Sequence, residues 1–485
     1  MIGDATRSEI PANAGDTLGF FSYNTRNARC GPGGAPDRPD PGPRPPVLRP
    51  IRLITLAPGH FHAALVHQDM IPGVHPRVLV YAPLDDDLLS YIQHVHQFNT
   101  RRERPTTWEL DVRAGSHFLE RFVREQLGNT AVITGRHRAK IDHLLHAAEC
   151  GLHVLADKPW ISSFDDFPKL EKVFREADLR DTICWDMMTE RFEVTSLLQR
   201  ELMRDPDVFG GPLVGTPDDP TLLLESTHYL KKIVAGRPLR RSAWWFDPDE
   251  AGIALTDVGT HLADLAMWLL FPDTPVDYTK DIKLLDAACW PTPLSRAQLQ
   301  EVTGLPDFPA TVAPKYISGD RLLYPGNGTA TYTLKGAHVR LNVMWDFESE
   351  TELRDTHEAI ARGSKARISV RHAPQPGGGS RPELYVAANE SGHHAAVLAG
   401  VKKRCVAWQR PIPGVAATDL GSQIRIDVPD RFRAGHEAHF LSVFREFMTY
   451  FHSPRQMPPW ERPNLLAKYY VTTKAAQLAL QKQSK

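Results

Sequence analysis

Cysteine is scarce in this sequence, and the few copies are far apart. The 485 residues contain five, Cys30, Cys150, Cys184, Cys289 and Cys405, with no Cys-x-x-Cys pair among them. An odd and widely spaced set does not fit a disulfide framework or a cysteine-based zinc site, and it is typical of reduced thiols. The N-terminus also lacks a basic segment followed by an apolar one, which is the pattern of a secretory signal. We therefore expect a cytoplasmic protein.

Excess charge and long apolar runs are missing as well. Lys plus Arg number 57 and Asp plus Glu number 58, which gives a formal net charge of -1. Without a basic surplus there is no bulk electrostatic attraction to nucleic acid or to an anionic membrane surface. No uninterrupted apolar stretch reaches about 18 residues, the length that predicts a transmembrane helix. We expect neither nucleic acid nor a membrane among the partners.

What is present is the composition of an ordinary globular enzyme, with 42% hydrophobic and 24% charged residues. A chain of 485 residues is too long for one typical core, so two domains are expected. The first 50 residues are dense in proline and glycine, as in "CGPGGAPDRPDPGPRPPVLRP". Such a segment favours extended, unpacked backbone. It is either a disordered leader or a polyproline segment that binds a partner.

Strands and helices alternate from Ile51 onward. Runs such as "RVLVYA" and "NTAVITG" are separated by helical segments, which predicts βαβ units and a parallel sheet. After about Arg191, segments such as "TLLLESTHYL" indicate strands joined by short turns. The predicted fold class is α/β. A tail over 1–50 precedes a Rossmann domain with a doubly wound parallel sheet over 51–190, and a C-terminal α+β domain with a largely antiparallel sheet follows over 191–485.

Two segments together resemble one enzyme family. "GLHVLADKPW" ends a predicted strand in Asp157-Lys158-Pro159, and "LTDVGTHLADLAMWLL" places Asp257, His261 and Asp264 along the entry to a helix. The pair is similar to the Glu-Lys-Pro and Asp-x-Gly-x-His-x-x-Asp motifs of the Gfo/Idh/MocA oxidoreductases. "WDMMTERFEVTSLLQREL" and "DTHEAIARGSKARISVR" resemble one branch of that family with its own type of C-terminal domain. The resemblance covers about residues 51–484.

The resemblance implies a catalytic group made of Lys158, Asp257 and His261. Oxidising a secondary alcohol requires removal of the hydroxyl proton while hydride leaves the carbon. A histidine is suited to take the proton, and a lysine can donate to the developing alkoxide. Asp257 and His261 are four residues apart, so they share a face if the helix has begun. The alternatives are a capped helix whose histidine merely packs, with Asp257 as the cap, and a surface lysine at a strand end. Lys158 precedes a proline, which predicts an extended conformation or a cis bond.

The turn after the first strand is an altered form of the glycine-rich dinucleotide turn. Gly-x-Gly-x-x-Gly would align with residues 57–62, where only the middle glycine, Gly59, survives. The N–H groups of the following helix can still attract phosphate, and His60 or His62 can add a donor. We therefore predict that NAD binds at Gly59, His60, Phe61 and His62, and at Asp157 and Lys158.

The cofactor's ribose and nicotinamide contacts are less regular. Asp85, Asp86 and Asp87 follow the second strand by a few residues, and one of them reaching the 2′-hydroxyl would favour NAD over NADP. Asp85 is the acid that we assign to the cofactor site, although a solvated acidic helix start explains the three equally well. Thr134, Gly135 and Arg136 occupy the strand end where the family has nicotinamide contacts. NADP stays possible.

Four residues of the second domain are candidates for a substrate pocket: Arg191, His228, Lys231 and Trp245. Cationic groups hydrogen-bond hydroxyls and tryptophan faces stack on sugars, although "SAWWFDP" is also typical of a core aromatic cluster. His436 and His439 lie three apart, but no third ligand is evident, and we predict no metal.

The leading prediction is an NAD(P)-dependent oxidoreductase that transfers hydride between the cofactor and a hydroxyl of a sugar, polyol or glycoside. One alternative is a redox-neutral enzyme with tightly held NAD, which oxidises a sugar transiently and cleaves a glycoside by elimination. A second is a non-catalytic protein that binds sugar or nucleotide. We expect a homo-oligomer formed through the C-terminal sheet.

Overall fold

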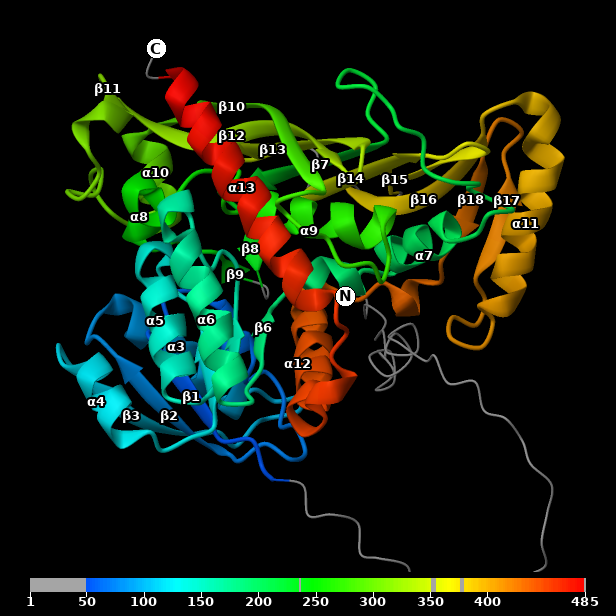
Figure 1. Cartoon of the computed structure of the whole chain (residues 1–485). Coiled ribbons are helices and arrows are strands. Elements are labelled where there is room, and N and C mark those ends of the chain that lie inside the picture. Colours follow the sequence, from blue (N-terminus) through cyan, green and yellow to red (C-terminus); the bar gives the residue numbers. More distant parts are fainter. Residues whose placement is uncertain (1–48, 235–236, 350–354, 376–378, 484–485) are drawn as a thin grey trace, which may run out of the picture.

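The structure is a computed structural model that describes residues 49–234, 237–349, 355–375 and 379–483. The predicted tail over 1–50 therefore lies almost entirely outside the described residues. Figure 1 shows two layered regions built around two sheets.

The first sheet has six strands that all run parallel. Its order is β3-β2-β1-β4-β5-β6, so the order reverses beside β1. The short central strands β1 and β4 and the edge strand β6 are fully buried, and the central strand β5 has three of its four residues buried, because helices cover both faces. The predicted doubly wound parallel sheet is confirmed. The strands are β1 (Leu53–Leu56), β2 (Arg77–Ala82), β3 (Glu109–Ala114), β4 (Thr130–Ile133), β5 (His153–Ala156) and β6 (Cys184–Asp186).

Each connection of this sheet carries a helix, as right-handed parallel crossovers require. The helix between β1 and β2 is only four residues long, whereas the three longest have 13 to 15 residues. The helices are α2 (His62–Leu65), α3 (Asp86–Thr100), α4 (Phe118–Glu125), α5 (His137–Glu149) and α6 (Phe167–Leu179).

The second sheet has ten strands, in the order β10-β12-β13-β7-β14-β15-β16-β18-β17, with β11 paired to β12. Only β13 and β7 run parallel, and the other pairs are antiparallel. The prediction of a largely antiparallel sheet is confirmed. The strands are β7 (Leu222–Tyr229), β10 (Ile282–Ser295), β11 (Ile317–Ser318), β12 (Arg321–Leu334), β13 (Ala337–Asp346), β14 (Thr356–Arg362), β15 (Ala366–Pro374), β16 (Ser380–Ala388), β17 (Ala416–Asp419) and β18 (Ile424–Asp427).

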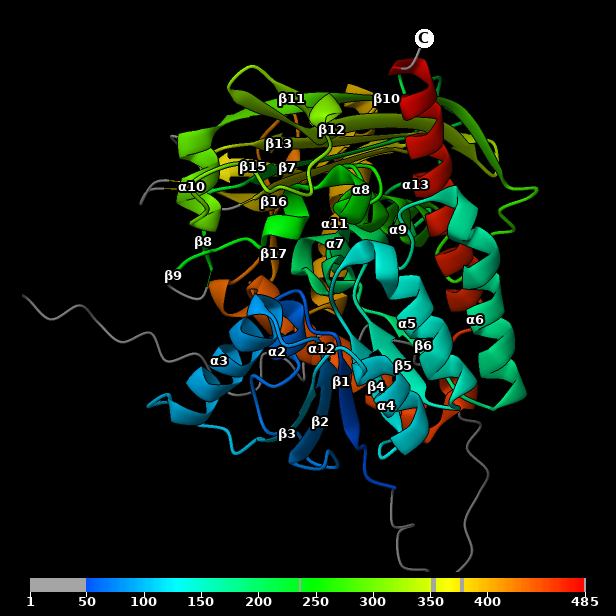
Figure 2. The same ribbon diagram turned by 90° about the vertical axis from the view of Figure 1, so that its left-hand side faces the viewer.

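The helices that follow β6 lie mostly between the two sheets or at their edges (Figures 1 and 2). The 12-residue helix α9 packs with β7 and β13, and 11 of its residues are buried. A small pair, β8 (Ile233–Val234) and β9 (Arg237–Pro238), stands apart from the large sheet. The helices are α7 (Val194–Met203), α8 (Pro248–Ala251), α9 (Gly259–Leu270), α10 (Arg296–Thr303), α11 (His394–Ala407), α12 (His436–His452) and α13 (Glu461–Gln483).

The last two helices return to the first sheet. Phe440, Phe444 and Phe447 of α12 share a buried cluster with the strands β1 and β2. Tyr469 of α13 stacks on Trp160, which follows β5, with ring centroids 6.3 Å apart. Residue 190 separates the two sheets, but α12 and α13 come after it and pack against the first sheet. The domain boundary at residue 190 therefore stays a prediction. None of the described helices combines the length and the apolar character that crossing a membrane requires.

Candidate active site

The turn after β1 lies against the turn after β4, at the point where the strand order reverses. The Gly59 N–H donates to the Thr134 carbonyl at 2.8 Å. A Cβ on Gly59 would lie 3.1 Å from both the Arg136 nitrogen and the Gly135 Cα, and a Cβ on Gly135 would collide with the Ala57 carbonyl. Both glycines are therefore needed for this close approach of backbones. In doubly wound sheets the crevice at such a reversal is where ligands bind.

The helix that follows this turn differs from the expected phosphate-binding helix. α2 spans only four residues, His62–Leu65, and Phe61 at its N-cap has no capping side chain. A single turn sums few peptide dipoles, so its attraction for a phosphate is weak. Phosphate binding at the N–H groups of this helix therefore stays a prediction, with a much shorter helix to support it.

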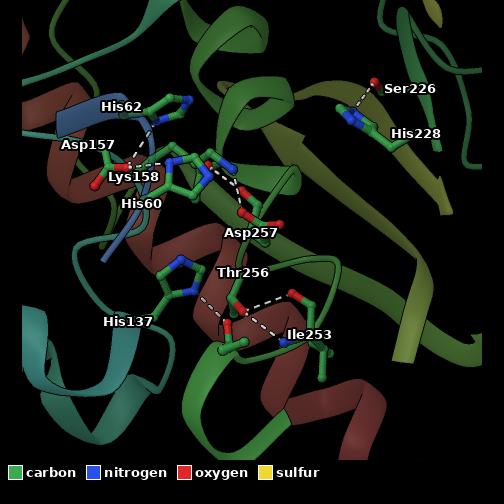
Figure 3. A network of polar contacts seen from close by, with 12 residues as sticks. His60, His62, His137, Asp157, Lys158, Ser226, His228, Ile253, Thr256 and Asp257 are labelled. Carbon is green, nitrogen blue, oxygen red and sulfur yellow. Dashed lines mark hydrogen bonds and ion pairs between the residues drawn. The ribbon is translucent and has the colours of Figure 1, made fainter. Parts of the chain in front are cut away.

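Asp157, directly after β5, is the centre of a buried polar cluster (Figure 3). Its Oδ2 lies 3.0 Å from His62 Nδ1 and 3.5 Å from His60 Nδ1, and its Oδ1 accepts from Lys140 Nζ at 2.6 Å. Burial alone would raise the pKa of Asp157, but the Lys140 ammonium and the two imidazoles hold that pKa well below its usual value. Burial lowers the pKa of His60. Both imidazoles therefore turn their Nδ1 atoms toward Asp157, and their predicted contact with a phosphate stays a prediction.

Sequence analysis missed Lys140, and a signal for it existed. In α5 the buried residues His137, Lys140, Ile141 and Leu144 recur at helical spacing. A lysine on such a buried stripe needs a charged partner inside the protein. The period of the helix could thus have marked Lys140 as a site residue.

Lys158 and Asp257 form an ion pair that joins the first sheet to the second region (Figure 3). The residues are 99 positions apart, and their side chains are only 12% and 11% exposed. Burial would raise the pKa of Asp257, but Lys158, then His137 and His228, lower it far below its usual value. Asp257 is therefore a carboxylate at any working pH. The Lys158–Pro159 bond is cis, one of the two forms that the sequence predicts.

A tight loop brings Asp257 to this position. The Asp257 N–H donates to the Ile253 carbonyl at 3.1 Å, and the Thr256 hydroxyl donates to the same carbonyl at 2.9 Å. His137 Nδ1 lies 2.7 Å from the Ala251 carbonyl, which ties α5 to the start of this loop. The loop is thus fixed from both regions.

Asp257 and His261 would share one face of a helix only if the helix began at Asp257, but α9 begins two residues later. It starts at Gly259, its N-cap Val258 has no side-chain cap, and the Asp257 carboxylate contacts Lys158 instead. The alternative in which Asp257 merely caps the helix is therefore not what the structure has. His261 lies in the first turn of α9, with its N–H donating to the Val258 carbonyl at 3.0 Å.

Comparison with known proteins gives the family. Residues 198–480 match the family described as "Putative oxidoreductase C terminal domain". The chain is 37% identical to an oxidoreductase from Parabacteroides merdae, described as putative, with 90% of this chain and 98% of that one covered and a TM-score of 0.84. The chain belongs to this oxidoreductase family. None of the curated proteins matches it.

Two more distant structures share the fold of this oxidoreductase. One is a 3-ketoreductase from Actinomadura kijaniata in complex with NADP and TDP-benzene, at 13% identity, 88% and 96% coverage and a TM-score of 0.51. The other is an oxidoreductase from Agrobacterium radiobacter with NAD+, L-tartaric acid and magnesium, at 11% identity, 89% and 97% coverage and a TM-score of 0.54. The prediction of an oxidoreductase is confirmed.

His228, another predicted substrate residue, lies on β7 and contacts Ser226 (Figure 3). Its Nδ1 lies 2.9 Å from Asp355 Oδ2 and its Nε2 lies 2.8 Å from Ser226 Oγ. His228 is among the residues that lower the pKa of Asp257. The Lys232 ammonium also contacts Asp355, at 2.5 Å. Sequence analysis missed both Lys232 and Asp355.

Two other predicted substrate residues are held elsewhere. The Arg191 guanidinium is buried in ion pairs with Asp264 at 2.6 Å and Glu461 at 2.8 Å, so it joins the segment after β6 to α9 and α13. Lys231 lies near the surface, between Glu301 and Glu348. Each cation already has two carboxylate partners, and a contact of either one with a sugar stays a prediction.

Trp245 is part of an aromatic cluster, as the alternative interpretation of its segment predicts. It is buried, and its ring stacks on Tyr324 at a centroid distance of 4.9 Å. The Arg241 guanidinium covers the same ring at 4.5 Å. Trp245 therefore shapes the site through packing.

The acidic residues after β2 begin α3 and also pair with Arg136. Asp85 caps α3 by accepting from the Leu88 N–H at 3.1 Å, and it also pairs with Arg136 at 3.2 Å. Asp87 pairs with Arg136 at the same distance and accepts from the Ser242 hydroxyl at 2.8 Å. Two carboxylates and a guanidinium thus lie together between the turns that follow β2 and β4.

Glu190, which follows β6, is a further titratable group that sequence analysis missed. Burial, with the neighbouring charges of Glu193 and Asp355, raises its pKa to about 7, while Lys158 opposes the rise. In the sequence, Glu190 is marked only by its position two residues after the apolar segment that continues β6. That is a weak signal.

We expect Glu190→Gln to change the pH dependence of stability. Between the ordinary pKa of 4.5 and about 7, folded chains keep a proton on Glu190 that unfolded chains have lost, so the free energy of unfolding falls as pH rises through this window. Glutamine stays neutral, so the variant matches the wild type near pH 4.5 and is the more stable of the two above pH 7. Urea unfolding at a series of pH values measures this, with exposed Glu120→Gln as control. Parallel stability curves for wild type and Glu190→Gln would contradict it.

Proposed function

We propose that this oxidoreductase transfers hydride between NAD and a hydroxyl of a sugar, polyol or glycoside. The observation that carries the proposal is the buried ion pair of Lys158 and Asp257. It stands at the carboxyl end of the parallel sheet, where doubly wound folds bind nucleotides. A buried lysine held by a carboxylate from the other region is suited to stabilise an alkoxide, because its charge is fixed before the reaction.

The backbone at the strand reversal fits a dinucleotide. Gly59 and Gly135 form a cradle that a Cβ at either position would fill. Gly59, Thr134 and Gly135 are the residues that would hold the phosphates, and Asp85 and Asp87 with Arg136 would hold the adenosine ribose. The two carboxylates favour a free 2′-hydroxyl over a 2′-phosphate, so we propose NAD as the preferred cofactor. When bound, it supplies the hydride acceptor.

The chain's own residues manage the proton. His261 takes the hydroxyl proton as general base. Lys158 donates a hydrogen bond to the alkoxide as it forms, and Asp257 holds the Lys158 ammonium in place. His228, held by Asp355, contributes a polar wall for the other hydroxyls.

One observation favours a second candidate, redox-neutral glycoside cleavage by transient oxidation and elimination. Elimination needs another acid or base besides the one that serves the alcohol. Glu190, with a pKa raised to about 7 by burial and neighbouring acids, is such a group and senses the charge of Lys158.

Identifying a bound dinucleotide and following its turnover tests these proposals. We expect acid-released NAD by mass spectrometry from the purified protein, and NADH absorbance with at least one member of a panel of sugars, polyols and glycosides. Sugar product without net NADH would select the redox-neutral enzyme. Sugar or nucleotide binding without any turnover across the panel would overturn both in favour of a binding protein. We further propose a cytoplasmic homo-oligomer that associates through the second sheet, which size-exclusion light scattering checks.

We expect Gly59→Val to weaken NAD binding by roughly 10–100-fold. The added side chain begins 3.1 Å from the Gly135 Cα, and overpacking of this kind costs about 1–3 kcal/mol. Calorimetric titration with NAD measures the loss. Gly392→Val is the matched control, because a Cβ there meets nothing within 4 Å. Equal NAD affinity in Gly59→Val and wild type would show that the phosphates bind elsewhere.

A further inference from the structure

We propose that His60, His62 and Asp157 bind a divalent transition-metal ion of the Zn²⁺, Mn²⁺ or Fe²⁺ class. The three side chains come from the turn after β1 and from the end of β5, and Figure 3 shows them gathered beside the Lys158–Asp257 pair. Metal binding here does not depend on the proposed hydride transfer. It departs from the sequence-based prediction, which was that no metal binds.

The spacing of the three ligand atoms suits one ion. One nitrogen of each imidazole and one carboxylate oxygen all lie within 4.8 Å of one another. Asp157 Oδ2 is 3.0 Å from His62 Nδ1 and 3.5 Å from His60 Nδ1. Ligands at about 2.0–2.1 Å from a tetrahedral ion are about 3.3 Å apart. The observed pairs lie on either side of that value.

Hydrogen bonds between the three residues account for only part of this arrangement. His60 Nδ1 is buried and makes no hydrogen bond to any residue that the structure describes. Its 3.5 Å separation from Asp157 is too long for a good hydrogen bond. A buried nitrogen without a partner costs free energy, and an ion placed between His60, His62 and Asp157 would satisfy it.

The surroundings of the cluster resemble the second shell of a metal site. Lys140 Nζ holds the other oxygen of Asp157 at 2.6 Å, which leaves Oδ2 to act alone. The His62 ring packs against Phe440 with centroids 4.5 Å apart, and this fixes its orientation. Two imidazoles and one carboxylate are a known ligand set for zinc and non-haem iron that leaves coordination positions open. Because Lys140 and Lys158 are cationic neighbours, we expect an anionic oxygen to fill an open position.

Metal titration of the full chain tests the proposal. After chelation and dialysis, the protein is titrated by calorimetry with Zn²⁺, Mn²⁺ or Fe²⁺ one at a time, the last without oxygen, and the bound metal is counted by elemental analysis. We expect one ion per chain for at least one metal. We expect His60→Ala to weaken that binding by more than the roughly 10–100-fold that loss of an outer-shell partner causes. His96→Ala, which removes an exposed imidazole on α3, serves as control and binds as the wild type does.

Two outcomes would overturn the proposal: no stoichiometric ion in the wild type with any of the three metals, or equal affinity in His60→Ala. His62 is buried, so its alanine variant can lose structure, and the more exposed His60 is the decisive position. Thermal unfolding adds a second readout, since a bound ion raises the melting temperature of the wild type and leaves that of His60→Ala unchanged. Dinucleotide release is measured separately, so failure of the proposed function and failure of the metal site are distinguishable.

Discussion

Replacing Lys158 by alanine is expected to lower kcat by roughly 10²–10³-fold, the range for loss of one donor to a developing oxyanion. The Lys158 ammonium is buried and contacts Asp257, so water cannot take its place without losing the fixed geometry. Steady-state turnover on the substrate identified from the sugar panel measures the effect. Lys172→Ala is the matched control, because Lys172 is exposed on α6 and pairs with Glu149 at 2.7 Å.

Stability must be separated from chemistry in this experiment. Lys158→Ala leaves the Asp257 carboxylate buried without its cation, which costs about 3–5 kcal/mol. The double variant Lys158→Met, Asp257→Asn removes both charges and is expected to recover much of the stability but none of the turnover. A Lys158→Ala variant that turns over at a near-normal rate would show that the ion pair is structural.

The sheets were predictable because their signals are local. Most strands of the first sheet are short apolar runs, and helices alternate with them; β3, with the sequence ELDVRA and no buried residue, is the exception. In the second region, β12 to β16 follow one another with no described helix between them. The length of α2 was not predictable in this way. Residues 62–66 continue an apolar pattern, yet the helix ends at Leu65, and Pro72 and Gly73 follow before the next strand.

The site was only partly predictable, because its contacts join distant residues. Arg191 is occupied by Glu461, which lies 270 positions later. The alternation of side chains along β7 does not show which of Lys231 and Lys232 points inward, because β7 ends at Tyr229. Lys158 and Asp257 were predicted from a family motif. The Asp157 cluster could not be predicted in this way, because its members come from the segment after β1, the end of β5 and α5, which only the fold brings together.

Replacing His261 by alanine is the other large effect that we expect, a fall in kcat of roughly 10²–10⁴-fold for loss of a general base. His261 lies in the first turn of α9, directly after the loop that holds Asp257. NAD affinity is expected to change little, because the imidazole comes from the region that does not hold the cofactor. Turnover and calorimetric NAD binding are measured on the same preparation, so a folding defect would appear in both.

A double variant shows whether His261 and Lys158 serve one step. If His261 takes the proton while Lys158 stabilises the alkoxide, each acts on the same transition state, and their losses do not multiply. We expect the double variant to be close to the more damaged single variant. His338→Ala is the control, because His338 is a partly exposed histidine of β13 whose Nδ1 lies 3.2 Å from the Val214 carbonyl. Near-normal turnover of His261→Ala would contradict the assignment and leave His261 as a packing residue of α9, with the proton passing to Glu190 or His228 instead.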